Sequence, residues 1–274
     1  FGFKSRGLGD VYKRQQWRSL QAVAAKAPEL ESFPRTPKDW TDEITSHARD
    51  LRIGRSKLVY DETSDEQINQ SVISSMFNFF GMAEKELLVM NAYVIPAQQG
   101  VDFLQGLTDK GVKIRLLTNS LASHDVPAVN SHYEPWRDDF IRAGVDLYEF
   151  RSDAAIKSST VEVPPVTADF IGLHSKSAVV DRRYVFVGSM NLDPRSAKIN
   201  TEMGAFVDSP ELAEDLAQII ERDMSGENAW HVQMDDEGTI TWHNSDETLT
   251  KQPARDGMQR VMNVLMKIGP AEQY

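Results

Sequence analysis

One short segment, residues 172–196, gathers the side chains best suited to chemistry. His174, Lys176 and Asp181 follow the pattern H-x-K-x-x-x-x-D. A lysine ammonium binds phosphate oxygens and stabilises the charge that develops on them. An imidazole beside it can attack phosphorus or protonate a leaving oxygen. The pair therefore indicates chemistry at a phosphodiester, and such a site needs neither a metal nor a cofactor.

A second group, G-S-x-N, follows at a fixed offset and comprises Gly188, Ser189 and Asn191. Glycine lets the backbone approach a phosphate closely, and the hydroxyl and amide are hydrogen-bond donors. We therefore predict that Gly188 binds substrate and that Ser189 and Asn191 belong to the catalytic set. Asp181 belongs to that set through its motif, but its odd offset from His174 leads us to expect that it organises the turn.

Two neighbouring strands must position these residues. The sequence predicts strands over 172–180 and 184–187, joined by a turn over 181–183. Because alternate side chains of a strand share a face, His174 and Lys176 should point the same way and Ser175 and Ser177 the other.

The region before this segment alternates strands with helices. This order indicates an α/β fold, a layered α/β/α domain with a mixed, largely parallel sheet. The predicted strands are 87–95, 112–117 and 145–150, and the predicted helices are 65–80, 100–110 and 133–143. Towards the end of the chain, 230–243 is predicted to be a hairpin and 254–269 a helix.

The loop after the 112–117 strand carries Asn119, Ser120, His124 and Asp125. Ligands of α/β proteins often bind beyond the carboxyl ends of strands. We therefore predict that Asn119 and Ser120 bind substrate and that His124 and Asp125 lie close by. The alternative is a solvated loop.

The chain divides into three parts by composition. Residues 1–15 begin with Phe1, lack periodicity and resemble translated adaptor sequence, so we expect a non-native stretch. Residues 16–53 are predicted to be a helix and a proline-containing linker from a preceding, truncated lobe. Residues 54–274 are predicted to be one domain that ends in the hairpin and helix.

Charge and composition exclude several classes of function. Lys plus Arg is 30 and Asp plus Glu is 41, so the net charge is −11. This balance argues against a broad nucleic-acid-binding surface and against purely electrostatic adhesion to an anionic bilayer. The absence of cysteine excludes disulfides, thiolate catalysis and cysteine-ligated zinc. The helix 254–269 carries an apolar stripe (Met258, Val261, Met262, Leu265, Met266), which either packs on its own domain or lies on a bilayer.

The segment 172–196 resembles the HKD motif of the phospholipase D superfamily. LVYDE, NAYVIPAQQG, HYEPWRDDF and VFVGSMNLDPRSAKINTEMG follow the order found in the C-terminal half of bacterial cardiolipin synthases of the C type. The resemblance implies a two-lobed fold in which each lobe supplies one HKD motif. It implies that one histidine forms a phosphohistidine with a phosphatidyl donor while the other protonates the leaving alcohol and activates the acceptor. In relatives with two motifs the first histidine is taken as the nucleophile, which would make His174 the acid/base partner. Glu202 matches an acidic position that orients an active-site histidine.

The same resemblance implies the partners and the product. We expect cardiolipin to be made from phosphatidylglycerol and a second phospholipid, by an enzyme of the bacterial cytoplasm that is peripheral at the inner membrane and binds no nucleic acid. The printed sequence contains a single H-x-K-x-x-x-x-D. Either a preceding lobe supplies the other motif or two copies pair. The alternatives are a homodimeric phosphodiesterase or nuclease of the same superfamily, and an inactive fragment.

Overall fold

The computed structural model describes residues 17–22, 24–26, 33–63, 68–162 and 167–268. The chain forms two units, one comprising 1–51 and 157–169 and the other 52–156 and 170–274. The stretch 1–15, predicted to be non-native, lies outside the described residues. Every predicted catalytic or substrate-binding residue belongs to the second unit.

The first unit contains a helix where a linker was predicted. Helix α2 (Pro37–Ala48) begins after Thr36, whose side chain accepts a hydrogen bond from the Asp39 N–H while Asp39 caps the Thr36 N–H in return. Proline at the first helical position is compatible with this start, since its missing N–H would have no intrahelical partner. The proline that suggested a linker therefore opens a helix. The same unit contains the short α7 (Lys157–Thr160).

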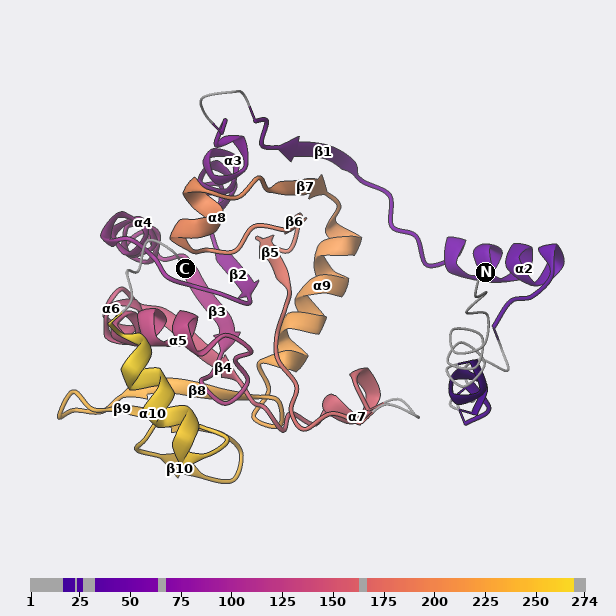
Figure 1. Cartoon of the computed structure of the whole chain (residues 1–274). Helices are drawn as coiled ribbons and strands as arrows, with labels where there is room; N and C mark the ends of the chain where they lie inside the picture. The colour runs from indigo at the N-terminus through magenta and orange to yellow at the C-terminus, as the bar shows by residue number, and fades with distance from the viewer. Residues whose placement is uncertain (1–16, 23, 27–32, 64–67, 163–166, 269–274) are drawn as a thin grey trace, which may run out of the picture. The chain divides into compact units, whose positions relative to one another are not determined.

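The second unit is built on one ten-stranded sheet in the part of the chain that the structure describes. Its order is β1-β7-β6-β5-β2-β3-β4-β8-β9-β10 (Figure 1). The strands are β1 (Arg55–Tyr60), β2 (Glu86–Asn91), β3 (Lys113–Asn119), β4 (Val145–Phe150), β5 (Lys176–Val180), β6 (Tyr184–Gly188), β7 (Met203–Asp208), β8 (Ala229–Met234), β9 (Ile240–His243) and β10 (Thr248–Leu249).

The sheet is mixed, but it is mostly antiparallel, so the prediction of a largely parallel sheet was wrong. Only β2–β3 and β3–β4 pair in parallel among the described strands. Strand β5 pairs antiparallel with β2, and β6 and β7 extend the same antiparallel run. Strand periodicity reports which side chains share a face, whereas the direction of a neighbouring strand depends on long-range pairing.

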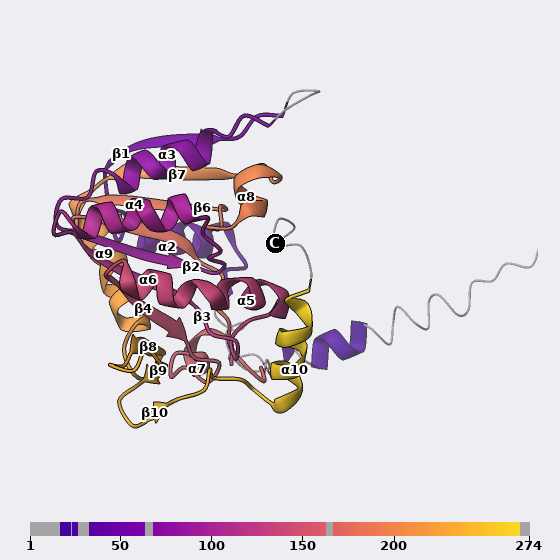
Figure 2. The same ribbon diagram turned by 90° about the vertical axis from the view of Figure 1, so that its left-hand side faces the viewer.

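Helices cover both faces of the sheet, as the layered α/β/α prediction required. Figures 1 and 2 show α3, α4, α5 and α6 on one face and α9 on the other. Their bounds are α3 (Ser71–Phe80), α4 (Gln98–Thr108), α5 (Pro127–Tyr133), α6 (Arg137–Arg142) and α9 (Pro210–Asp223). Two further helices, α8 (Pro194–Lys198) and α10 (Gly257–Met266), complete this unit.

The structure shortens one predicted helix and divides another. The helix predicted over 65–80 begins at Ser71, and residues 64–67 lie outside the described residues. The helix predicted over 133–143 is α6, preceded by a separate α5 and a 3-10 turn over Glu134–Trp136. Pro135 lies in that turn, where its missing N–H and fixed φ interrupt a regular α-helix.

The core lies on both sides of the central strands. Leu87, Leu88 and Val89 of β2 are all buried. A strand buried on both faces reads as a continuous apolar run, which is why the 87–95 strand was recognisable in the sequence. This rigid centre holds the ends of β2, β3 and β5, where the predicted site residues lie.

Candidate active site

One pocket in the second unit gathers five of the six residues predicted to be catalytic. They come from the segment before β5, the end of β6 and the segment before β7. These residues are His174, Lys176, Ser189, Asn191 and Glu202, and the pocket they line has a volume of about 570 Å³.

His174 lies two residues before β5 and not within a strand as predicted. Its backbone nevertheless stays extended beside β2, because the Ala92 N–H donates to the Ser175 carbonyl at 3.0 Å. The predicted alternation is confirmed. His174 and Lys176 both line the pocket, whereas the hydroxyls of Ser175 and Ser177 lie 3.0 Å apart on the other side.

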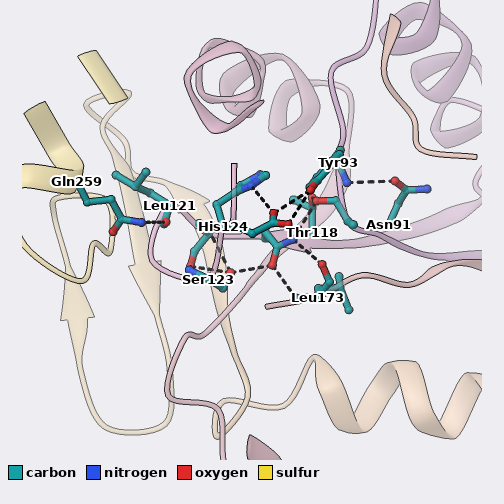
Figure 3. Close-up of polar contacts among 12 residues, drawn as sticks. Asn91, Tyr93, Thr118, Leu121, Ser123, His124, Leu173 and Gln259 are labelled. Carbon is teal, nitrogen blue, oxygen red and sulfur yellow. Dashed lines mark hydrogen bonds and ion pairs between the residues drawn. The ribbon is translucent and has the colours of Figure 1, made fainter. Parts of the chain in front are cut away.

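Asn119 holds the backbone immediately before His174. Its amide nitrogen donates to the Leu173 carbonyl at 2.8 Å, and its amide oxygen accepts from the Leu173 N–H at 2.8 Å. The nitrogen also donates to the Ala92 carbonyl at 3.0 Å, and the oxygen accepts from the Ser123 hydroxyl at 2.9 Å. Figure 3 shows Leu173 beside Ser123 in this cluster. The side chain of Asn119 thus makes the two hydrogen bonds to Leu173 that the backbone of a neighbouring strand would otherwise make.

This geometry gives Asn119 and Ser120 structural partners, and their binding of substrate stays a prediction. Both residues are buried, and neither lines the pocket. The Ser120 hydroxyl donates to the Phe150 carbonyl at 2.7 Å, so it fastens the end of β3 to β4. Asn119 contacts the site indirectly, because its amide binds the backbone of Leu173, the residue before His174.

Lys176 places a nearly buried ammonium against the floor of the pocket. Its Nζ donates to the His174 carbonyl at 2.9 Å and lies 5.7 Å from the centre of the Tyr93 ring. Burial lowers the pKa of Lys176, and the charge of Glu202 opposes that effect. A phosphate bound in the pocket would add a charge-assisted hydrogen-bond acceptor for this ammonium.

Glu202 is the centre of a hydrogen-bond network on the opposite wall. It accepts from the Ser189 hydroxyl and from the Asn200 amide, the latter at 3.2 Å. The Ser189 hydroxyl in turn accepts from the Met203 N–H at 3.0 Å. Ser189 and Glu202 therefore form one unit with fixed geometry.

Asp61 supports this wall and was missed by the sequence analysis. Its carboxylate accepts from the Glu202 N–H at 3.1 Å and from the Val72 N–H at 3.0 Å. It therefore ties the segment that carries Glu202 to the beginning of α3. Asp61 directly follows β1 and lies within LVYDE, one of the segments on which the resemblance rests, and that segment was the signal that could have identified it.

Tyr93 lies next to His174 and Lys176 without lining the pocket, and the sequence analysis left it without a role. Its ring centre lies 6.4 Å from that of His174 in an edge-on arrangement. The other side of the ring stacks on His124 with centres 5.3 Å apart, as Figure 3 shows. Its hydroxyl donates to Asp125 at 2.8 Å. Burial, followed by this hydrogen bond, raises the pKa of Tyr93 well above its ordinary value, so the phenol stays protonated.

Asp181, the last residue of the motif, lies at the opposite end of β5 from the pocket. Its carboxylate accepts from the backbone N–H groups of residues 84–86 at 2.8–2.9 Å. Burial raises the pKa of Asp181, but these backbone donors together bring it below its ordinary value. The structure therefore places Asp181 in the turn, as expected from its offset, and away from the reacting groups.

Packing requires a glycine at position 188, and the predicted contact of Gly188 with substrate stays a prediction. A Cβ atom at Gly188 would lie 2.5 Å from the Met203 carbonyl oxygen and 2.8 Å from the Phe186 ring. Gly188 pairs with Gly204 of β7, where a Cβ would meet the same ring at 2.4 Å. The two glycines make room for Phe186, and Gly188 does not line the pocket.

The pocket thus combines an exposed imidazole, a buried ammonium and fixed hydroxyl and amide groups. Asn191 contributes an amide oxygen that is buried without a hydrogen-bond partner among the described residues. Such a constellation suits a tetrahedral phosphate whose oxygens need several donors. The imidazole of His174 is open to a reacting group, while Lys176 and Ser189 lie within the same pocket.

Comparison with known proteins identifies similar chains. A family model described as "Cardiolipin synthase, PLD-like domain" matches residues 76–224. Cardiolipin synthase C of Escherichia coli strain K12 is 38% identical over 205 residues, which cover 72% of this chain and 42% of that protein. Cardiolipin synthase B of Shigella flexneri is 22% identical over 181 residues, which cover 65% of this chain and 39% of that protein.

The chain spans about two fifths of the length of the curated relatives it matches. Among solved structures, the phospholipase D family member Nuc from Salmonella typhimurium aligns with a TM-score of 0.48 and 17% identity, covering 64% of this chain and 97% of that one.

Proposed function

Because this chain belongs to the family of cardiolipin synthase, PLD-like domains, we propose that it is the part of a phosphatidyltransferase that carries one of two HKD motifs. The observation that carries this proposal is the shared pocket of His174, Lys176, Ser189, Asn191 and Glu202. It unites an acid/base or nucleophilic group with a cation and donors for phosphate.

The proposed reaction has two steps. In the first, one histidine attacks the phosphorus of phosphatidylglycerol, a P–N bond forms, and the P–O bond to glycerol breaks as the other histidine protonates the glycerol oxygen. In the second, the headgroup hydroxyl of another phospholipid gives its proton to that second histidine and attacks phosphorus, and the P–N bond breaks. The first step releases glycerol, and the second step yields cardiolipin when the acceptor is another phosphatidylglycerol. The resemblance assigns the acid/base role to His174, and Lys176 would hold the phosphate oxygens in both steps.

The second histidine would come from another lobe or from a second copy of this chain. An exposed apolar sheet face beside the pocket supports such a partner. It consists of Leu58, Tyr60, Val187 and Met203, each about half exposed or more. Tyr60 pairs with Met203 across β1 and β7, and Val187 is two residues before Ser189 on the same face. Exposed apolar patches of this kind mark interaction sites.

Helix α10 supports contact with a lipid surface. It turns polar Gln259 and Asn263 inward, where Gln259 donates to the Leu121 carbonyl at 2.6 Å and Asn263 bonds Asn130 and Glu134. Figure 3 shows Gln259 reaching Leu121. The outward apolar side chains are Met258, Val261, Val264, Leu265 and Ile268.

This arrangement extends the sequence prediction for residues 254–269. Met262 and Met266 are half-buried, while Met258, Val261 and Leu265 face outward, so the stripe only partly packs on its own unit. None of the described helices is long and apolar enough to cross a membrane. A peripheral position at a bilayer is the corresponding proposal.

The test combines the chain with a lobe of the same family that carries another HKD motif, and supplies phosphatidylglycerol. Cardiolipin and glycerol are measured by mass spectrometry. His174→Ala should lower kcat by roughly 10²–10⁴-fold, the usual contribution of general acid–base catalysis. His243→Ala, on the β9 hairpin strand, is the matched control and should leave kcat unchanged. The proposal would be contradicted if the unmodified chain and the second lobe formed no cardiolipin together, or if His174→Ala kept full activity.

A further inference from the structure

A second, apolar cavity lies in the same unit, enclosed by α3, α4, α8 and the sheet. Its volume is about 260 Å³. Among the described residues that line it, only Gln99, Asp193 and Lys198 carry polar side chains. The carboxylate of Asp193 is engaged elsewhere, because it accepts from the Ser196 N–H at 2.7 Å and caps α8. The interior of the cavity is therefore suited to hydrocarbon.

This cavity opens to the surface. Phe77, Gln99 and Lys198 line it and are exposed, so they form its mouth. Apolar cavities of about 150 Å³ stay dry and bind benzene. A space of this larger size with a cation at the mouth fits a hydrocarbon chain that is joined to an anionic headgroup.

Two hydrogen-bonded segments lead from the catalytic pocket to the cavity. In one, Tyr93 borders the catalytic residues while Val94 and Ile95 line the cavity. In the other, Asn191 lines the catalytic pocket and Leu192 lines the cavity. The Ile95 N–H donates to the Leu192 carbonyl at 2.7 Å, and the Leu192 N–H donates to the Tyr93 carbonyl at 3.0 Å. The same two segments therefore border both the catalytic pocket and the cavity.

Helix α8 separates the two spaces and is short. Ala197 and Lys198 line the cavity, and the next residue, Ile199, lines the catalytic pocket. Five helical residues span about 7.5 Å. A lipid acyl chain reaches across half of a hydrocarbon core of about 30 Å. A phospholipid with its phosphate at Lys176 is therefore long enough to extend past α8 into the cavity.

We infer that this cavity is the subsite for one acyl chain of the phospholipid that reacts at His174. The inference rests on the proposed phosphatidyl transfer and adds the part of the protein that holds the lipid tail. It assigns α3, α4 and α8 a role in selecting the substrate by its chain. Lys198 would meet the polar region of the lipid at the mouth of the cavity.

The experiment uses photolabelling of the whole chain by phosphatidylglycerol that carries a diazirine at the end of one acyl chain. Every protein in the labelling experiment also carries His174→Ala, so that the lipid is not consumed. Labelled peptides are identified by mass spectrometry, and they should come from α3, α4 and α8. Gly100→Phe adds a side chain to the cavity wall, where a Cβ meets only the Pro96 Cβ at 3.4 Å. It should lower this labelling roughly tenfold, as expected when a few methylene contacts are lost.

Gly106→Phe is the matched control on the same helix, because a Cβ there meets nothing within 4 Å and Gly106 does not line the cavity. It should leave the labelling unchanged. Labelling confined to other segments, or equal labelling in Gly100→Phe and Gly106→Phe, would overturn the inference. Cardiolipin formation is measured in parallel with His174 present. Transfer without labelling in the cavity refutes the subsite alone, whereas labelling without transfer refutes the proposed function alone.

Discussion

Single side chains hold the reactive groups by binding backbone. Asn119 makes four hydrogen bonds, two of them to the backbone of Leu173, and Lys176 donates to the carbonyl of His174. The position of the His174 imidazole therefore depends on a residue that does not line the pocket. A buried amide suits this task because it offers both a donor and an acceptor to one peptide group.

Asn119→Ala should lower kcat of the assembled enzyme by about tenfold or more while KM changes little, because a misplacement of about 1 Å reduces catalysis strongly. The free energy of unfolding should fall by about 1–3 kcal/mol, since buried backbone groups lose their partners. Urea unfolding and steady-state kinetics measure the two effects.

Asn130→Ala is the control for this variant. Asn130 is also fully buried, but its amide donates to Asn263 of α10 at 2.8 Å. It should destabilise the unit by a similar amount with little change in kcat. Equal losses of kcat in both variants would mean that Asn119 acts only through stability.

At the scale of elements, the β5–β6 turn explains the aspartate of the motif. Asp181 and Arg182 both have positive φ, 52° and 53°, and the Arg183 N–H donates to the Val180 carbonyl at 3.0 Å. This is the type I′ geometry, in which Asn-Gly is favoured. Side-chain contacts offset the strain here. Asp181 binds the backbone before β2, and Arg182 pairs with Glu86 at 2.6 Å and also with Glu221.

Asp181→Asn should lower the free energy of unfolding at pH 7 by about 1–3 kcal/mol, because a charged acceptor of three backbone donors is lost. The pKa of Asp181 is lower in the folded chain than the unfolded value of about 3.9. Its stabilising effect is therefore complete above that unfolded value and is lost as the pH falls through the folded pKa. Urea unfolding between pH 7 and pH 2 should show the difference between the two proteins shrinking only in the acid range.

Asp208→Asn provides the comparison, because Asp208 pairs with Arg183 at 2.8 Å at an exposed position. Exposed pairs contribute at most about 1 kcal/mol. A loss in Asp208→Asn as large as that in Asp181→Asn would mean that the backbone contacts of Asp181 are unimportant.

For the second unit as a whole, exposed apolar side chains of the described residues gather on the sheet face beside the pocket and on α10. The exposed sheet face lies beside the catalytic pocket. Helix α10 packs on α5 (Figure 2), and its apolar side is the one that faces away from this contact. We assign the sheet face to the partner that supplies the second histidine and the apolar side of α10 to the bilayer. Arg260 is exposed on α10, which suits an anionic lipid, and the exposed Lys267 that follows the helix pairs with Glu134 at 3.1 Å.

The double variant Val261→Glu with Leu265→Glu should weaken binding to phosphatidylglycerol vesicles at least tenfold, because each apolar side chain that leaves water contributes roughly 1.5–3 kcal/mol. Vesicle sedimentation measures this binding. Ile219→Glu, which replaces an exposed apolar residue of α9, is the control and should bind as the unmodified chain does. Equal vesicle binding by all three proteins would exclude α10 as the lipid contact.

The amino-acid sequence alone was enough to predict which residues gather at the candidate site, because most of them lie within one strand–turn–strand. His174, Lys176, Ser189 and Asn191 are at most 17 positions apart, and strand alternation places His174 and Lys176 together. Local apolar runs likewise identified β2, β3 and β4. The resemblance to the phospholipase D superfamily rested on this same local pattern, together with the order of the surrounding segments.

The surroundings of these residues could be learned from the three-dimensional structure alone. The bonds of Asn119 to Leu173, of Asp181 to the backbone of residue 84 and of Asp61 to Glu202 join positions 54, 97 and 141 residues apart. Hydrophobic periodicity carries no information about such pairs or about strand direction, because both are set by which segments meet when the chain closes on its core. The same reason explains why α10 buries its amides and exposes its apolar side: its partners on α5 and after β3 are polar, and hydrogen bonding to them outweighs the local pattern.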